Sequence, residues 1–278
     1  MIISIASGKG GTGKTTVAVN LALSVKDAQY LDFDVEEPNA SIFLKAEIEE
    51  SEDVKVEIPK INYERCDFCG KCADFCVYNA LAVVPSNVLV FPELCHSCRG
   101  CSLVCPRDAI DWRYRVVGRI EHGTAKDIDF YQGLLNIGEI QSLPVIRSLK
   151  QKIDKNKNVI IDAPPGTSCP VIETVSGSDY CILVAEPTPF GLHDLKLTVE
   201  TLRHIGIPFG VIVNKDGIGD RKIDFYCQTE KIPIIARIPH DRDIAHLYSK
   251  GIPFVEELED WKIKFREIYD TIEEEVEG

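Results

Sequence analysis

The sequence has little positive charge: 31 Lys and Arg residues stand against 44 Asp and Glu, and the formal net charge is −13. Nonspecific nucleic-acid binding depends on Lys and Arg residues that neutralise phosphates, so this balance argues against that class of function. Docking on an anionic membrane surface likewise needs basic clusters. We therefore expect neither nucleic-acid binding nor direct membrane binding.

Long apolar runs and a basic leader are also missing. No run approaches the ~18 consecutive apolar residues of a membrane span. The short apolar stretch Met1–Ala6 has no basic residue before it, and glycine-rich sequence follows at once. This pattern predicts a strand rather than a signal peptide. Since 45% of the residues are apolar, the chain can bury a core, and we expect a cytoplasmic protein.

Short apolar runs alternate with helical patterns along most of the chain. Helical patterns cover Lys14 to about Lys26 and His193–His204, and the apolar runs are Ile2–Ala6, Tyr30–Asp34, Val159–Asp162, Tyr180–Ala185, Val211–Asn214 and Ile232–Ala236. This alternation predicts an α/β fold with a mostly parallel sheet flanked by helices. The acidic stretch Glu47–Glu57 interrupts the pattern, and we expect it to be a solvated connector.

An apolar stripe at helical spacing lies near the C-terminus, formed by Leu258, Trp261, Phe265, Ile268, Ile272 and Val276. The residues between them are mostly acidic, whereas helices that lie on membranes are normally basic on their polar face. We therefore expect this helix to pack against the core.

Cysteine is concentrated in one segment: eight of the eleven cysteines lie between Cys66 and Cys105. In a chain without an export signal, such density indicates metal binding rather than disulfides. A C-x₂-C-x₂-C-x₃-C run occurs twice, 29 residues apart, as Cys66, Cys69, Cys72, Cys76 and as Cys95, Cys98, Cys101, Cys105. The repeat predicts a small duplicated module at residues 59–112, inserted between residues 1–58 and 113–278 of the α/β domain.

A phosphate-binding loop is predicted between the first strand and the first helix. Gly8–Thr15 fits the pattern G-x-x-x-x-G-K-[ST]. Glycines let backbone N–H groups surround phosphate oxygens, Lys14 reaches the β- and γ-phosphates, and the Thr15 hydroxyl can bind Mg²⁺. We therefore expect ATP and Mg²⁺ here, with nucleotide contacts from Gly8, Lys9, Gly10, Gly11, Thr12, Gly13, Lys14, Thr15 and Thr16.

Lys9, at the second position of this loop, makes it resemble the deviant Walker A ATPases, which include MinD, ParA, Mrp and the nitrogenase iron protein. In that family this lysine reaches across a dimer to the partner's nucleotide. The resemblance implies a P-loop ATPase that forms an ATP-dependent homodimer, with Lys9 and Lys14 in the catalytic machinery.

Four further segments resemble the same family. In Leu31–Asn39 the resemblance implies that Asp34 orients the attacking water and that Asp32 helps to hold the Mg²⁺ shell; alternatively, the two acids only cap a turn. Val159–Gly166 looks like a Walker B segment, with Asp162 supporting Mg²⁺. Further along the chain, Asn214 is implied to read the adenine edge, and Pro239 and Asp241 to lie in the loop that closes over the base.

The cysteine runs resemble a bacterial two-[4Fe–4S] ferredoxin, a small α+β module. In such ferredoxins the fourth cysteine of each run binds the cluster of the other run. One cluster would then use Cys66, Cys69, Cys72 and Cys105, and the other Cys95, Cys98, Cys101 and Cys76. Zinc sites typically show two cysteine pairs and fit this spacing poorly. Val77 follows the first run where Pro106 follows the second, a difference that leaves the ligands in place.

Three functions remain open at this point. We favour an ATP-gated electron carrier that serves a redox partner protein, because the eight cysteines of residues 66–105 have the ligand pattern of retained clusters. The chain could instead be an iron–sulfur cluster scaffold or carrier of the Mrp type with a client protein, although Cys227 lacks the second cysteine of the C-x-x-C used there. It could also be a spatial organiser like ParA or MinD with a redox-sensing insert. Cys181 is expected in the core, and Cys169 and Cys227 are expected to be ordinary small residues.

Overall fold

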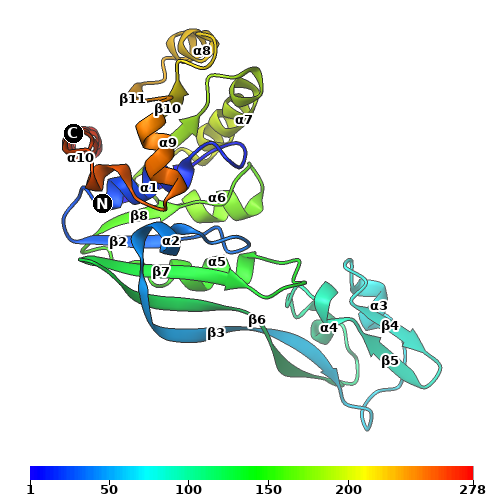
Figure 1. The fold of residues 1–278 in the computed structure, drawn as a ribbon. Helices are drawn as coiled ribbons and strands as arrows, with labels where there is room; N and C mark the ends of the chain where they lie inside the picture. The colour runs from blue at the N-terminus through cyan, green and yellow to red at the C-terminus, as the bar shows by residue number, and fades with distance from the viewer. Residues whose placement is uncertain (278) are drawn as a thin grey trace.

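A computed structural model gives the architecture of residues 1–277. Within these residues, the main sheet has nine strands in the order β11-β10-β9-β1-β8-β2-β7-β6-β3 (Figure 1). Their bounds are β1 Ile2–Ala6, β2 Ala28–Asp32, β3 Glu47–Ile61, β6 Ile110–Ala125, β7 Ile128–Leu135, β8 Asn158–Asp162, β9 Tyr180–Ala185, β10 Phe209–Asp216 and β11 Ile234–Pro239.

The sheet is parallel from β11 to β7, and β6 and β3 add an antiparallel edge. The predicted α/β fold with a mostly parallel sheet is therefore confirmed. Helices cover both faces, with bounds α1 Lys14–Ala22, α2 Ala40–Leu44, α5 Leu143–Lys150, α6 Cys169–Val175, α7 Pro189–Ile205, α8 Lys222–Glu230, α9 Arg242–Ser249 and α10 Glu259–Glu277. None of the helices within residues 1–277 is long and apolar enough to cross a membrane.

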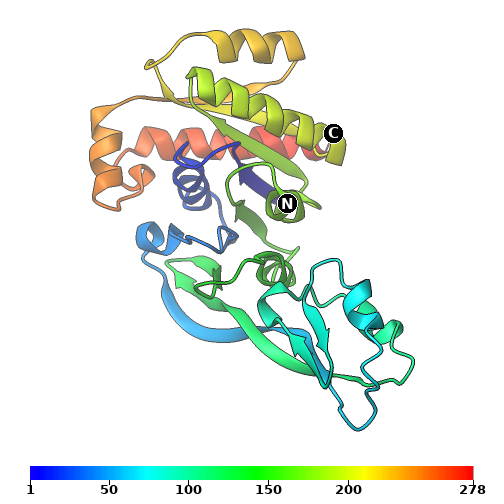
Figure 2. The same ribbon diagram turned by 90° about the vertical axis from the view of Figure 1, so that its right-hand side faces the viewer.

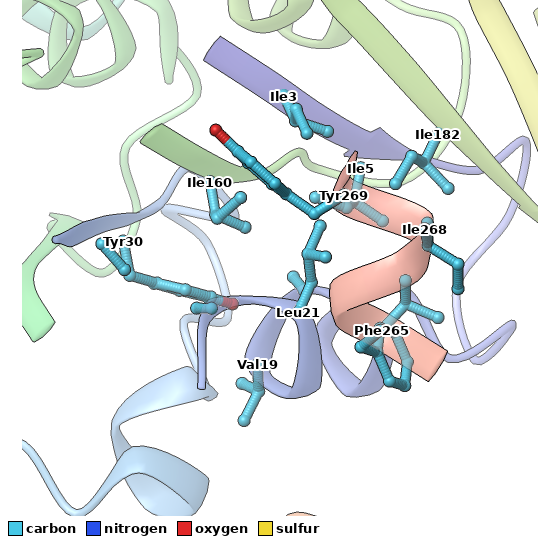
Figure 3. Packing of buried hydrophobic residues seen from close by; sticks show 14 of the residues in the cluster. Ile3, Ile5, Val19, Leu21, Tyr30, Ile160, Ile182, Phe265, Ile268 and Tyr269 are labelled. Atoms are coloured by element: carbon cyan, nitrogen blue, oxygen red, sulfur yellow. The ribbon is translucent and has the colours of Figure 1, made fainter. Parts of the chain in front are cut away.

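Side chains of the buried strands alternate between two core layers, as a strand period of two requires. Tyr180 and Ile182 of β9 pack with α1 and α10 on one face, whereas Cys181 and Leu183 pack with α6, α7 and α8 on the other. Figure 3 shows the first layer, where Leu21 of α1 and Phe265, Ile268 and Tyr269 of α10 gather over the strands. The parallel strands are thus buried on both sides, which explains their continuous apolar runs.

The predicted C-terminal stripe packs against the core except at its last residue, Val276, which is 37% exposed. Phe265 and Ile272 of α10 are fully buried, and Leu258 and Trp261 lie against the same core layer. Burying one such side chain stabilises the fold by about 1.5–3 kcal/mol. The helix therefore belongs to the core of the main lobe.

Two predicted elements were wrong. Residues Glu47–Glu57 are not a connector but form most of β3, which pairs along its length with β6. The side chains of Val54 and Ile58 point into the core, whereas the acidic side chains of β3 stay in solvent. Because β3 is an edge strand, its charges discourage pairing with strands of other molecules. The first helix ends at Ala22 rather than near Lys26. Beyond this end, the Ser24 hydroxyl donates a hydrogen bond to the Asn20 carbonyl, and Asp27 has a left-handed backbone conformation.

Residues 62–109 form a small lobe that the β3–β6 ribbon carries away from the main sheet (Figures 1 and 2). It contains α3 Lys71–Phe75, the hairpin β4 Leu81–Val84 and β5 Asn87–Val90, a 3₁₀ turn at Pro92–Leu94, and α4 Gly100–Leu103. Its apolar cluster includes Leu81 and Val88, together with Ile110 at the start of β6.

The sequence repeat is visible in the backbone of this lobe. Left-handed residues occur in pairs that are 29 positions apart: Phe68 and Ser97, Gly70 and Arg99, Asn79 and Asp108. Helices α3 and α4 begin at matching positions of the two runs. The two cysteine runs therefore adopt the same local structure.

Candidate nucleotide site and cysteine cavities

The loop between β1 and α1 has the shape that its glycines require. Gly11 and Gly13 have φ angles of 76° and 94°, a left-handed region that favours glycine. A Cβ atom on Gly13 would lie 2.2 Å from Nδ2 of Asn214, which donates a hydrogen bond to the Thr12 carbonyl at 2.7 Å. The loop is thus held against the end of β10.

The other loop residues expected to bind nucleotide lie around this turn. A Cβ on Gly8 would meet the backbone of Asp194 in α7 at 2.5 Å, whereas Gly10 has open space beside it. The Thr16 carbonyl accepts a hydrogen bond from Asn20 in the first turns of α1. Residues 8–13 therefore form a loop that packs against α7, and residues 14–16 begin α1.

Two buried ionisable side chains, Lys14 and Asp162, lie near the loop. Lys14 is 6% exposed, and Asp162, the last residue of β8, is 1% exposed. Burial raises the pKa of Asp162, and the Lys14 charge with the Thr15 and Tyr30 hydroxyls opposes that rise. Oδ1 of Asp162 is buried without a hydrogen-bond partner, as is Oγ1 of Thr12. An unpartnered carboxylate oxygen beside Lys14 and Thr15 fits a Mg²⁺ ion or its bound water.

Asp32 folds the segment that follows β2. Its side chain is fully buried and accepts backbone N–H groups of Asp34 at 3.1 Å, Asn39 at 3.1 Å and Ala40 at 3.2 Å. Burial and the nearby Asp162 charge raise the pKa of Asp32, although these hydrogen bonds oppose the rise. Asp32 thus shapes the loop from residue 34 to residue 40 and supports the start of α2.

Asp34 is half-buried near Lys14 of the nucleotide loop. Burial raises its pKa to about 6, despite the attraction of Lys14. The next residue, Val35, accepts a hydrogen bond from the Leu135 N–H at 2.8 Å, which continues the pairing of β2 and β7. Asp34 therefore lies within a segment that the extended pairing of β2 and β7 holds in place.

Lys9 forms an ion pair with Glu186, a residue that the sequence analysis did not identify as part of the site. Its Nζ lies 3.3 Å from Glu186, which directly follows β9 and is 8% exposed. Lys215 bonds to the same carboxylate, and its Nζ also reaches the Gly11 carbonyl at 3.3 Å. Burial alone would raise the pKa of Glu186, but Lys215 and Lys9 lower it. The only hint in the sequence is that Glu186 directly follows the buried strand β9 and that Lys215 lies near the end of β10.

The residues expected near the adenine lie at the carboxyl ends of β10 and β11. Asn214 contacts the loop as described, and Pro239 pairs in register with Asp216. Asp241 caps the N-terminus of α9 by accepting the N–H groups of Asp243 and Ile244. The structure therefore brings these residues to the same edge of the sheet as the phosphate loop.

In the small lobe, eight thiols line two cavities. The first cavity is lined by Cys66, Cys69, Cys72 and Cys105, and the second cavity by Cys76, Cys95, Cys98 and Cys101. All are free cysteines, and Cys69 and Cys98 are exposed. Each cavity thus receives three thiols from one run and the last thiol of the other run.

The surroundings of the thiols repeat as the runs do. The Ala80 N–H donates to Sγ of Cys76 at 3.4 Å, and the matching Ala109 N–H donates to Sγ of Cys105 at 3.3 Å. Burial raises the pKa of Cys101 to about 11.

Among residues 1–277, no group of three or more Cys, His, Asp or Glu side chains is arranged to hold a metal ion.

The remaining cysteines lie in the main lobe. Cys181 of β9 is fully buried, and burial raises its pKa to about 12. Cys227 of α8 is also buried, with its pKa raised to about 11 by burial. Cys169 is exposed at the start of α6. Cys181 and Cys227 are core residues.

Comparison with known proteins places this site in a family. The family model described as the CobQ/CobB/MinD/ParA nucleotide binding domain matches residues 3–254. Two uncharacterized proteins of Methanocaldococcus jannaschii are 29% and 32% identical, over 99% of this chain and 96% and 97% of their own lengths. A protein of Pyrococcus abyssi named iron–sulfur cluster carrier protein is 25% identical, over 91% of this chain and 78% of its own length.

Solved structures show the same fold. The cell division ATPase MinD of Pyrococcus furiosus superposes with a TM-score of 0.59 at 19% identity and covers 98% of each chain. MinD of Pyrococcus horikoshii, complexed with Mg-ADP, gives 0.57 at 21% identity and covers 97% of this chain and 95% of its own. Because the family model spans the phosphate loop and the strands around it, the chain belongs to the CobQ/CobB/MinD/ParA nucleotide-binding domain family.

Proposed function

We propose that this chain is an ATP-hydrolysing iron–sulfur protein, in which a nucleotide-dependent homodimer works with two [4Fe–4S] clusters to pass electrons to a protein acceptor. The observation that supports this most is the division of eight cysteines into two cavities, each with three thiols of one run and one of the other. That division matches the crossed ligation of two-cluster ferredoxins. Residues 59–112 would then be a ferredoxin-like domain inserted in the ATPase domain.

The first and second cavities suit such clusters in their chemistry. Thiolates are the soft ligands that iron–sulfur clusters require. Backbone N–H groups donate to Cys76 and Cys105, and hydrogen bonds to sulfur, with limited solvent, tune a cluster. Leu81 and Ile110 supply apolar walls to the second and first cavity, respectively. When bound, the clusters would accept and release single electrons.

The nucleotide site would work by positioning and electrostatics. Lys14 and the loop N–H groups would hold the phosphates, and Thr15 and Asp162 would support Mg²⁺. Asp34 would orient the attacking water, with Asp32 fixing the loop that carries it. Lys9 would complete the site of the partner subunit. The supporting observations are the burial of Lys14 and Asp162 and the unpartnered oxygen of Asp162.

At the base, the proposal assigns Asn214, Pro239 and Asp241 to adenine contacts. All three lie at the carboxyl ends of β10 and β11, the edge where the phosphate loop also lies. Ligands of open parallel sheets bind outside this edge.

A second candidate function is that of a cluster carrier. Relatives at 25% identity bear the name iron–sulfur cluster carrier protein. One thiol in each cavity, Cys69 or Cys98, is exposed, which would give a recipient protein access to the cluster. Retention of the clusters distinguishes the two functions.

The test uses the full chain, purified and reconstituted without oxygen. Iron and sulfide should reach about eight of each per chain, and Mg-ATP should be hydrolysed. The reduced protein is then mixed with a one-electron acceptor dye or with a cluster-free ferredoxin, with and without Mg-ATP. Reduction of the dye with full iron retention supports electron transfer. Stoichiometric movement of iron to the cluster-free ferredoxin supports the carrier, and zinc in place of iron in native protein contradicts both.

A further inference from the structure

Two acids lie side by side where the neighbouring strands β2 and β8 end. Asp32 of β2 pairs in register with Asp162 of β8, and their side chains are 0% and 1% exposed. Residues paired in register on neighbouring strands point to the same face of a sheet, and like charges in such positions repel each other. The groups that surround each carboxylate therefore decide what it can bind.

The oxygens of Asp32 already have partners in the chain. Its Oδ1 accepts the N–H group of Asp34 at 3.1 Å, and its Oδ2 accepts those of Asn39 at 3.1 Å and Ala40 at 3.2 Å. Asp162 differs, because its Oδ1 is buried with no partner among residues 1–277. Buried polar atoms are rarely left in this state. The Oδ1 atom of Asp162 is therefore the oxygen that can face a Mg²⁺ ion or its bound water.

The other oxygen of Asp162 accepts a hydrogen bond from a tyrosine of β2. The Tyr30 hydroxyl donates to Oδ2 of Asp162 at 3.3 Å. Tyr30 pairs in register with Ile160, two residues before Asp162, so its long side chain reaches diagonally along one face of the sheet. The side chain of Tyr30 is completely buried in the core layer shown in Figure 3. Its hydroxyl thus meets a carboxylate rather than solvent.

Core packing holds the Tyr30 ring in place. The ring stacks with Phe130 of β7, with 5.9 Å between the ring centroids and 15° between the ring planes. Ile160 and Val19 belong to the same buried layer (Figure 3). A side chain whose rotamer is locked by packing offers its hydroxyl at a fixed position. A carboxylate that bonds to such a donor is held in one orientation.

We propose that Tyr30 is a positioning residue of the nucleotide site: its hydroxyl holds Oδ2 of Asp162, so that Oδ1 faces the Mg²⁺ ion or its bound water. The inference rests on the proposed function, because it requires that Asp162 supports Mg²⁺. Hydrogen bonds to the groups that hold a metal orient those groups and strengthen metal binding. Tyr30 acts through Asp162, so its loss should weaken metal binding without abolishing it.

Tyr30→Phe tests this role in the full chain, because it removes the hydroxyl and keeps the ring that stacks with Phe130. The probe is Mn²⁺, which accepts the same oxygen ligands as Mg²⁺, added to the chain with saturating ADP. Its binding is measured by the loss of the electron paramagnetic resonance signal of free Mn²⁺. The variant should bind Mn²⁺ roughly 3- to 10-fold more weakly than the parent, whereas its affinity for ADP without metal should stay unchanged. Parental Mn²⁺ affinity overturns the inference.

Tyr269→Phe is the matched control. Tyr269 belongs to the same core layer, and its hydroxyl donates to Oδ1 of Asn158 at 2.7 Å. Asn158 is the first residue of β8 and Asp162 is the last, so the two tyrosines bond to opposite ends of one strand. Tyr269→Phe should therefore leave the Mn²⁺ affinity unchanged. An equal loss of Mn²⁺ affinity in both variants would reveal a general effect on the fold and overturns the inference.

A double-mutant cycle shows whether Tyr30 acts through Asp162. In an Asp162→Ala background, Tyr30→Phe should cause no further loss of Mn²⁺ affinity, because the carboxylate that Tyr30 positions is absent. The same loss in both backgrounds overturns the inference. Parental Mn²⁺ affinity in Asp162→Ala itself contradicts the metal role of Asp162 in the proposed function, and the inference fails with it. Weak Mn²⁺ binding in Asp162→Ala but parental binding in Tyr30→Phe overturns the inference alone.

Discussion

Lys9 of the phosphate loop lies 3.3 Å from Glu186 of the same chain. Glu186 also forms an ion pair with Lys215, and Lys215 donates a hydrogen bond to the Gly11 carbonyl. One buried carboxylate therefore pairs with two lysines beside the phosphate loop. If Lys9 completes the nucleotide site of a partner subunit, it must first leave Glu186. The contact within one chain therefore competes with the contact between chains.

Glu186→Gln should strengthen ATP-dependent dimerisation by about 2- to 5-fold, since a partly exposed ion pair contributes roughly 0.4–1 kcal/mol. Lys9→Ala should weaken dimerisation and slow hydrolysis, while nucleotide affinity of the single chain stays nearly unchanged. The measurement is light scattering against ATP concentration, in an Asp34→Ala background for the dimerisation arm.

Glu173→Gln, which removes a surface pair with Arg147, is the matched control and should change nothing. Weaker dimerisation in Glu186→Gln would show that Glu186 positions Lys9 for its partner rather than withholding it. A chain that stays monomeric with ATP would contradict the role of Lys9 between subunits.

The loop residues and the cysteine runs could be predicted because their chemistry depends on neighbours in the sequence. Gly13 is the last residue of the loop after β1, and Lys14 is the first residue of α1. Glu186 could not be found in this way, because its meeting with Lys9 depends on β1 and β9 lying side by side. The β3–β6 ribbon was missed for a similar reason: the partner of the acidic stretch lies far along the chain, after the small lobe.

Substitutions of Asp32 and Asp34, at the end of β2, should have different effects. Asp34→Ala should still bind Mg-ATP but hydrolyse it poorly, because the residue that orients water is lost. Asp32→Ala removes the acceptor of three backbone N–H groups, and should lower the free energy of unfolding by about 1–3 kcal/mol. Parallel assays of ATP turnover and of urea unfolding distinguish the two. Parental hydrolysis by Asp34→Ala would show that the family resemblance fails at this segment.

Stability should fall in acid through Asp129 of β7. Burial alone would raise its pKa, but hydrogen bonds from Lys157 at 2.7 Å, His122 at 2.9 Å and Gln29 at 3.0 Å together lower it. Because the pKa of Asp129 is lower in the folded state than in the unfolded state, its ionised form stabilises the fold. This stabilisation is fully present above the ordinary aspartate pKa of about 4 and is lost as the pH falls through the folded-state pKa.

Asp129→Asn should therefore be less stable than the parent at pH 6, and the difference should shrink below pH 4. Thermal unfolding of both proteins at several pH values measures this gap. Asp127→Asn, in the exposed turn between β6 and β7, serves as the control. A gap that stays constant with pH would show that the loss comes from packing rather than from the charge of Asp129.

If the ligation is crossed, substituting the last cysteine of either run should damage the cluster of the other run. Cys105 belongs to the second run, yet it lines the first cavity with Cys66, Cys69 and Cys72. Cys105→Ala should therefore damage the cluster held by the first run, and Cys76→Ala should damage the cluster held by the second. Each variant should retain about four irons, because the other cavity keeps its four thiols. Iron analysis and electron paramagnetic resonance after anaerobic reconstitution measure the loss, with Cys169→Ala, an exposed cysteine of the main lobe, as the control. If each variant lost the cluster of its own run, the crossed pairing of thiols would have to be abandoned.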